Sequence, residues 1–110
     1  MKILFFIIVL IHGLIHIMGF IKAFKITEVE TLTIDIPKPI GLIWLLSCLL
    51  FFIYGFSYFL DNKYSCFIGL FSITISQILI ILSWNDAKYG SIINTLILII
   101  IAIELLKPFN

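Results

Sequence analysis

The stretch ILFFIIVLIHGLIHIMGFI, residues 3–21, decides the fold of this chain, because it is long, apolar and without charge. A bilayer core is about 30 Å thick, and a helix of about 20 apolar residues crosses it. Three further apolar runs follow, over residues 40–60, 64–84 and 92–106. The last run is long enough to cross when its helix starts near Tyr89. Four such runs predict a small polytopic membrane protein.

The composition supports this class. Of the 110 residues, 63% are hydrophobic and 12% charged, whereas a soluble domain is about half apolar and a quarter charged. The formal net charge is +1, and all seven basic residues are Lys. The chain therefore has neither the basic clusters that bind nucleic acid nor an Arg clamp for phosphate. We expect the lipid bilayer, not nucleic acid, as its partner, and a retained first helix instead of a cleaved signal peptide.

The predicted fold is all-α, a single transmembrane domain over residues 1–110. Four transmembrane helices, over about 3–22, 40–60, 64–84 and 89–106, form an up-down-up-down antiparallel bundle, with one sizeable loop over 23–39. Pro37 and Pro39 suit the start of the second helix, and residues 32–36 alternate as in an extended segment. We name the N-terminal side of the membrane side A and the opposite side, which carries the long loop, side B. Lys residues number three on side A and four on side B, which slightly favours a cytoplasmic side B.

Small and polar residues predict which helix faces point inward, because lipid tails are as apolar as Leu and do not drive helices together. Each helix has one such stripe. The predicted inward positions are His12, His16, Gly19 and Ala23; Gly41, Trp44, Cys48, Gly55 and Tyr58; Ser65, Gly69, Ser72, Ser76 and Ser83; and Ser91, Thr95 and Ala102 beside Asn94. We interpret Ser65, Gly69, Ser72 and Ser76 as packing positions only.

Three polar side chains from three helices are predicted to reach the same depth, toward side B. A rise of about 1.5 Å per residue places His16, Gln77 and Asn94 there, with His12 close by. One interpretation is that neutral imidazoles hydrogen-bond to amides or hydroxyls and lock the bundle. A second is that the site binds an organic ligand or relays protons. A third makes His12 and His16 metal or haem ligands, although two protein ligands without a nearby acid are an incomplete set.

The side B mouth carries further polar groups in the connection after the third helix. Asp86 either reaches inward to pair with a histidine or caps the fourth helix, while Lys88 extends toward water. Trp84 suits the aromatic belt at the membrane interface. The candidate ligand-binding residues are His12, His16, Gln77, Asn94, Asp86, Lys88 and Trp84.

No pattern in the sequence predicts an enzyme. Cys48 and Cys66 differ in depth by more than about 10 Å along their helices, which is too far for a disulfide. No C-x-x-C, nucleotide-binding or nucleophile motif occurs. We therefore favour a protein without catalytic activity.

Two motifs carry a resemblance to a family. HGLIHIMGF over residues 12–20 and WNDAKYGSIIN over 84–94 resemble an uncharacterised group of small bacterial four-helix membrane proteins, and the architecture is similar to that of DoxX-like proteins. The resemblance covers the whole chain and implies a bacterial inner-membrane location. It implies that His12, His16, Asp86, Lys88, Gly90 and Asn94 occupy recurrent motif positions, and it implies no specific activity.

These observations favour a structural or partner-binding membrane module, with another membrane protein or a second copy of the chain as its partner. The alternative is a membrane protein that binds a small molecule or cofactor, a quinone or haem, at the histidine-lined polar site.

Overall fold

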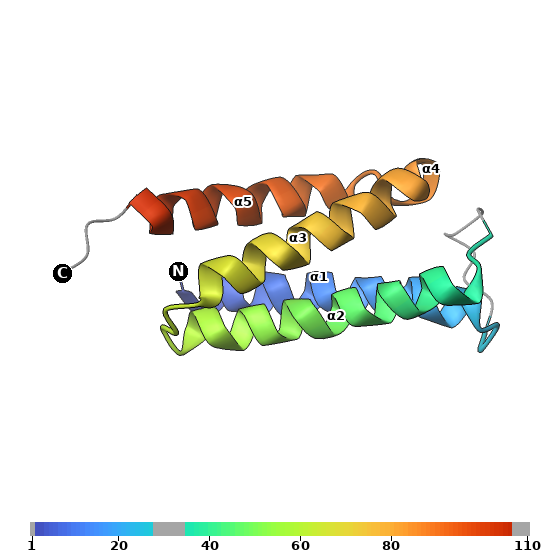
Figure 1. Ribbon diagram of the computed structural model, residues 1–110, viewed down its shortest axis with the longest axis horizontal. Helices are drawn as coiled ribbons and strands as arrows, with labels where there is room; N and C mark the ends of the chain where they lie inside the picture. Colours follow the sequence, from blue (N-terminus) through green and yellow to red (C-terminus); the bar gives the residue numbers. More distant parts are fainter. Residues whose placement is uncertain (1, 28–34, 107–110) are drawn as a thin grey trace.

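Helices make up most of the chain. The computed structural model describes residues 2–27 and 35–106. Its elements are α1 (Lys2–Ala23), α2 (Lys38–Phe59), α3 (Ser65–Leu82), α4 (Trp84–Ala87) and α5 (Gly90–Leu106), and no strand occurs among those residues (Figure 1). The prediction of an all-α protein is confirmed.

Three helices are long and apolar enough to cross a membrane. They are α1 and α2, with 22 residues each, and α3, with 18. The last apolar helix, α5, is shorter, with 17 residues. The connection predicted over residues 85–90 is not a simple loop, because it contains the short helical turn α4. The lengths and apolar composition of the three long helices support a membrane protein.

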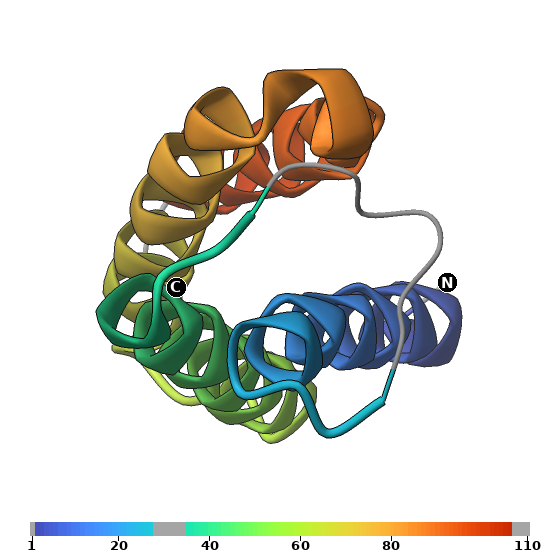
Figure 2. The same cartoon turned by 90° about the vertical axis from the view of Figure 1, so that its right-hand side faces the viewer.

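The four long helices lie lengthwise, and each runs opposite to the one before it (Figure 1). Seen end-on, they form an open arc in the order α1, α2, α3, α5 (Figure 2). The contact between α1 and α2 is the most extensive and that between α1 and α5 is sparse. The edge between the first and last helices is therefore the loosest in the structure.

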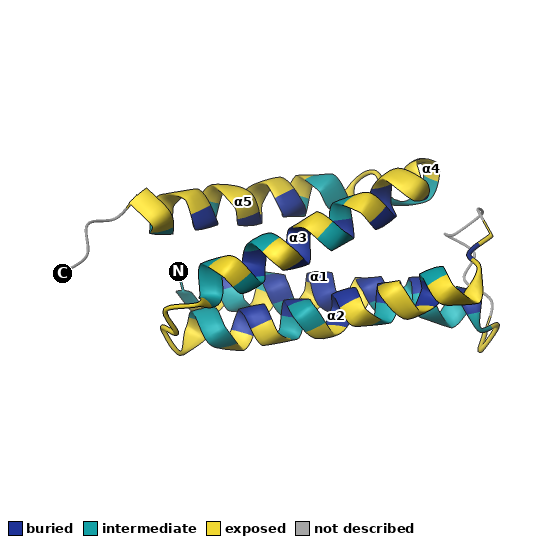
Figure 3. Ribbon diagram, viewed as in Figure 1, coloured by how far each residue is buried: buried dark blue, intermediate teal, exposed yellow. Residues whose placement is uncertain are grey.

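Exposed residues lie along the outer faces of the long helices (Figure 3), and many of them are large apolar side chains, whereas the buried residues include both apolar and polar side chains. Ile3, Ile53 and Phe67, for example, are 63%, 52% and 65% exposed. A soluble monomer rarely exposes so much contiguous apolar surface. This apolar outer surface matches a protein surrounded by lipid.

The predicted inward faces are confirmed for α1 and largely confirmed for α2 and α3, whereas on α5 the prediction is wrong for Thr95 and Ala102. All four α1 positions are buried; Tyr58 of α2 and Ser65 of α3 are only half-buried. On α5, Thr95 and Ala102 are exposed, and Asn94 is buried together with Ile97 and Ile101. The Thr95 hydroxyl donates to the Ser91 carbonyl within its own helix, so it needs no partner in the interior.

The long loop is only partly described. The extended segment predicted over residues 32–36 lies mostly outside the described residues. Ile36 is buried against Ala23, Trp44 and Leu79, and Pro37 precedes α2, whose first turn contains Pro39. The two prolines thus begin α2 as predicted.

Close packing of α1 against α2 generates a testable prediction. A Cβ added at Gly41 would overlap the Cβ of Ala23, a short side chain that cannot move aside. We expect Gly41→Ala to destabilise the protein by about 1–3 kcal/mol through overpacking, measured as the free energy of unfolding in mixed micelles. Gly55→Ala on the same helix is the control, because its Cβ would lie 3.3 Å from the mobile end of Leu10. Equal stability of the two variants would contradict the prediction.

Candidate functional site

A buried polar network joins three helices in the side B half of the molecule. His12 and His16 lie one turn apart on α1, Ser76 and Gln77 lie on α3, and Asn94 lies on α5. The two histidines are 4% and 2% exposed, and Asn94 is 5% exposed. The structure thus brings together the three residues predicted to share a depth, His16, Gln77 and Asn94, with His12 beside them, and it adds Ser76.

The hydrogen bonds of this network fit a single arrangement of protons. His16 Nδ1–H donates to the His12 carbonyl (2.7 Å), so that its Nε2 accepts from the Ser76 hydroxyl (2.6 Å). Asn94 Oδ1 accepts from His12 Nε2–H (2.9 Å), and Asn94 Nδ2 donates to Ser76 Oγ (3.0 Å) and to Gln77 Oε1 (3.1 Å). Each tautomer follows from its partner, because a carbonyl oxygen can only accept. Both imidazoles are neutral in this arrangement, which suits an apolar environment.

Gln77 extends the network toward the surface. Its Nε2 donates to Ser91 Oγ over 3.0 Å, and Gln77 itself is half-buried. This second bond between α3 and α5 places the amide of Gln77 between Asn94 and Ser91. The network therefore fixes the position of α5 against α3 at two successive turns.

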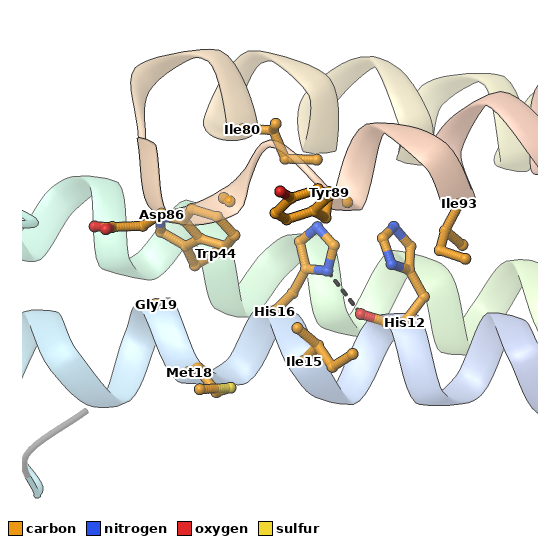
Figure 4. A pocket seen from close by; sticks show the side chains of 12 residues that line it. His12, Ile15, His16, Met18, Gly19, Trp44, Ile80, Asp86, Tyr89 and Ile93 are labelled. Atoms are coloured by element: carbon orange, nitrogen blue, oxygen red, sulfur yellow. Dashed lines mark hydrogen bonds between the residues drawn. The ribbon is translucent and has the colours of Figure 1, made fainter. Parts of the chain in front are cut away.

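A cavity of about 310 Å³ lies beside the histidines (Figure 4). Residues from α1, α2, α3 and the α4–α5 region line it: His12, Ile15, His16, Met18, Gly19, Trp44, Ile80, Asp86, Ala87, Tyr89, Gly90 and Ile93. Most of these side chains are apolar. The cavity therefore suits a mainly apolar molecule that meets a few polar groups.

Trp44 is held against α1 at this cavity. A Cβ on Gly19 would overlap its indole ring, so only glycine leaves room for the ring there. Trp44 is 5% exposed, and its Nε1 is buried with no hydrogen-bond partner in the part of the chain that the structure describes. An unpaired buried N–H costs about 1–3 kcal/mol. This donor is the least satisfied polar group at the site.

The structure separates the predicted candidate residues into two groups. His12, His16, Gln77 and Asn94 form the network, and Asp86 lines the cavity. Trp84 and Lys88 are exposed and do not line the cavity, and the Lys88 amine lies over the ring of Tyr89, 5.5 Å from its centre.

Sequence reasoning missed two contributions. The interpretation of Ser76 as a packing residue only is incomplete, because its hydroxyl donates to His16 and accepts from Asn94. Trp44 was predicted to face inward, but nothing in the sequence placed it beside the histidines. The one signal in the sequence is that Trp44 shares the predicted inward face of its helix with Gly41.

Metal coordination finds little support in this geometry. Within residues 2–27 and 35–106, no three His, Cys, Asp or Glu side chains gather in a group that could hold a metal ion. Both nitrogens of His16 are already bonded inside the protein. Cys48 and Cys66 are free thiols, as their depths predicted.

Comparison with known proteins yields no relative: no family model, no curated protein and no solved structure matches the chain.

The network predicts a specific sensitivity at Asn94. Asn94→Leu keeps the volume similar but leaves the His12 N–H and the Gln77 carbonyl without partners, so we expect a loss of about 2 kcal/mol or more in the free energy of unfolding in mixed micelles. The control is Thr95→Val on the same turn of α5, where the side chain is exposed, with an expected change within about 0.5 kcal/mol. If Asn94→Leu proves as stable as Thr95→Val, the network does not stabilise the fold.

Proposed function

We propose that this protein is a four-span integral membrane protein of the bacterial inner membrane that serves as a structural or partner-binding module. In this proposal α1, α2, α3 and α5 all cross the bilayer as an antiparallel bundle. α5 has 17 residues, which at about 1.5 Å per residue gives roughly 26 Å, close to the thickness of a hydrocarbon core. Its partner would be another membrane protein or a second copy of the chain.

The observation that carries this proposal is the hydrogen bonding between helices within the histidine network. Buried polar side chains in a membrane usually face the bundle interior and bond across helices. Here His16, Ser76 and Asn94 use one another as partners. A polar cluster that satisfies itself supports a role in fixing helix positions.

The resemblance to DoxX-like four-helix proteins remains part of the proposal. Its support is that motif residues from the two ends of the chain, His12 and Asn94, meet through a hydrogen bond of 2.9 Å. Motif residues that bond to each other across helices are those on which a shared fold would depend.

A second candidate function is the binding of a small molecule in the cavity beside the histidines. The cavity volume of about 310 Å³ lies at the lower end of the range of about 300–1,000 Å³ that ligand sites occupy. A haem needs a histidine nitrogen as its ligand, and both nitrogens of His16 are already bonded inside the protein, whereas a quinone needs only hydrogen bonds. The geometry therefore favours a ligand held without coordination.

Side-specific labelling tests the four-span arrangement. Single cysteines at Lys25, Asn62, Lys88 and Leu106, in a background of Cys48→Ser and Cys66→Ser, are treated with a membrane-impermeant maleimide in intact cells and in inverted vesicles. We expect positions 62 and 106 to react from one side and positions 25 and 88 from the other, because three crossings separate the first and last positions. Labelling of 88 and 106 from the same side would show that α5 does not cross.

A further inference from the structure

We propose that the cavity beside the histidines binds a lipid-soluble carbonyl compound, which enters between α1 and α5 and accepts a hydrogen bond from the Trp44 indole. The proposal rests on the membrane-spanning arrangement proposed above. It gives a chemical class to the ligand of the second candidate function, and it does not require the ligand to touch a histidine nitrogen.

The route into the cavity follows from the open edge of the arc. The cavity lies between α1 and the α4–α5 region, and α1 and α5 make only a sparse contact with each other. Ile15 and Tyr89 line it and are 55% and 73% exposed, so the cavity reaches the surface at this edge. In a bilayer the rim of Ile15, Met18 and Ile93 faces lipid, and the ligand therefore enters sideways from the hydrocarbon.

The indole of Trp44 supplies the hydrogen-bond donor. Its ring lies between His16 and Asp86 in the close-up (Figure 4). Its N–H has no acceptor among the described residues, and its ring packs directly against Gly19. The neighbouring His16 is fully bonded inside the network. An acceptor oxygen on a ligand would satisfy the one polar group that the protein leaves unpaired here.

The charges around the cavity select a neutral acceptor. Among the described residues that line the cavity, Asp86 is the one with a formal charge, and none is a Lys. A carboxylate or phosphate would lose its hydration without gaining a counter-charge and would meet an acidic residue, which is costly in an apolar site. A carbonyl oxygen accepts a hydrogen bond without carrying a charge. It could belong to a free ketone-type compound or to the ester of a membrane lipid.

A comparison of two probes tests the hydrogen bond. Benzophenone and diphenylmethane have the same two rings and differ by the carbonyl group. Their binding to the full-length protein in nanodiscs is measured by equilibrium dialysis against empty nanodiscs, which corrects for partition into lipid. We expect the ratio of benzophenone to diphenylmethane affinity to be about three- to tenfold lower in Trp44→Phe than in the unmodified protein, the effect of one lost hydrogen bond.

The second variant, Ile93→Phe, fills part of the cavity and leaves Trp44 in place. We expect it to weaken the binding of both probes while the ratio of their affinities stays unchanged. An unchanged ratio in Trp44→Phe, unchanged binding in Ile93→Phe, or no binding above empty nanodiscs would each overturn the proposal. If the cysteine labelling gives the expected topology but these binding tests fail, only the ligand site is overturned. A different topology would overturn the membrane-spanning arrangement itself.

The lipid of the nanodisc separates the two sources of the carbonyl group. Tighter benzophenone binding in ether-linked than in ester-linked lipid shows that a lipid ester competes for the same site. Equal binding in the two lipids indicates a free carbonyl compound. Both results support a carbonyl site and differ only in its natural occupant.

Discussion

The bonds from two α1 histidines to Ser76 and Asn94 are the interactions on which the rest of the structure depends. Hydrocarbon offers no hydrogen-bond partner, so the polar side chains of the network are stabilised at this depth by bonding to one another inside the protein. Helices in lipid gain little from burying apolar side chains against each other. The hydrogen bonds of the network therefore stabilise one relative position of α1, α3 and α5. It matters most between α1 and α5, whose contact is otherwise sparse.

The two ends of the molecule are held together by different chemistry. The side B half combines the polar network with an apolar cluster around Trp44 and Leu79. Toward side A the rings of Phe5, Tyr54 and Tyr58 pack together, with Phe5 and Tyr58 centred 4.8 Å apart in a T-shaped pair. At the side A surface, Lys2 pairs with Asp61 over 2.8 Å, an exposed ion pair that contributes little stability. Because the cavity lies beside the polar network, the part of the fold with the strictest geometry is also the part that could hold a ligand.

Much of the fold could be predicted from the sequence, because run length and helical spacing determine the all-α class, the approximate positions of α1, α2, α3 and α5, and the inward face of α1. The role of Ser76 could not. A helical serine usually satisfies its hydroxyl on its own backbone, as Ser72 does with the Ile68 carbonyl. Ser76 differs because His16 lies opposite it, and only the packing of α1 against α3 reveals this. Similarly, the place of Asp86 in the cavity depends on α4, a turn too short to leave a periodic pattern.

A double-mutant cycle on His16 and Ser76 measures directly the free energy by which the network couples α1 to α3. The free energies of unfolding of His16→Ala, Ser76→Ala and the double variant are compared with that of the unmodified protein in mixed micelles. If the bond of 2.6 Å stabilises the bundle, the coupling energy should be about 1 kcal/mol, within the range that such bonds reach in membrane proteins. Effects that add to within about 0.3 kcal/mol would contradict the account.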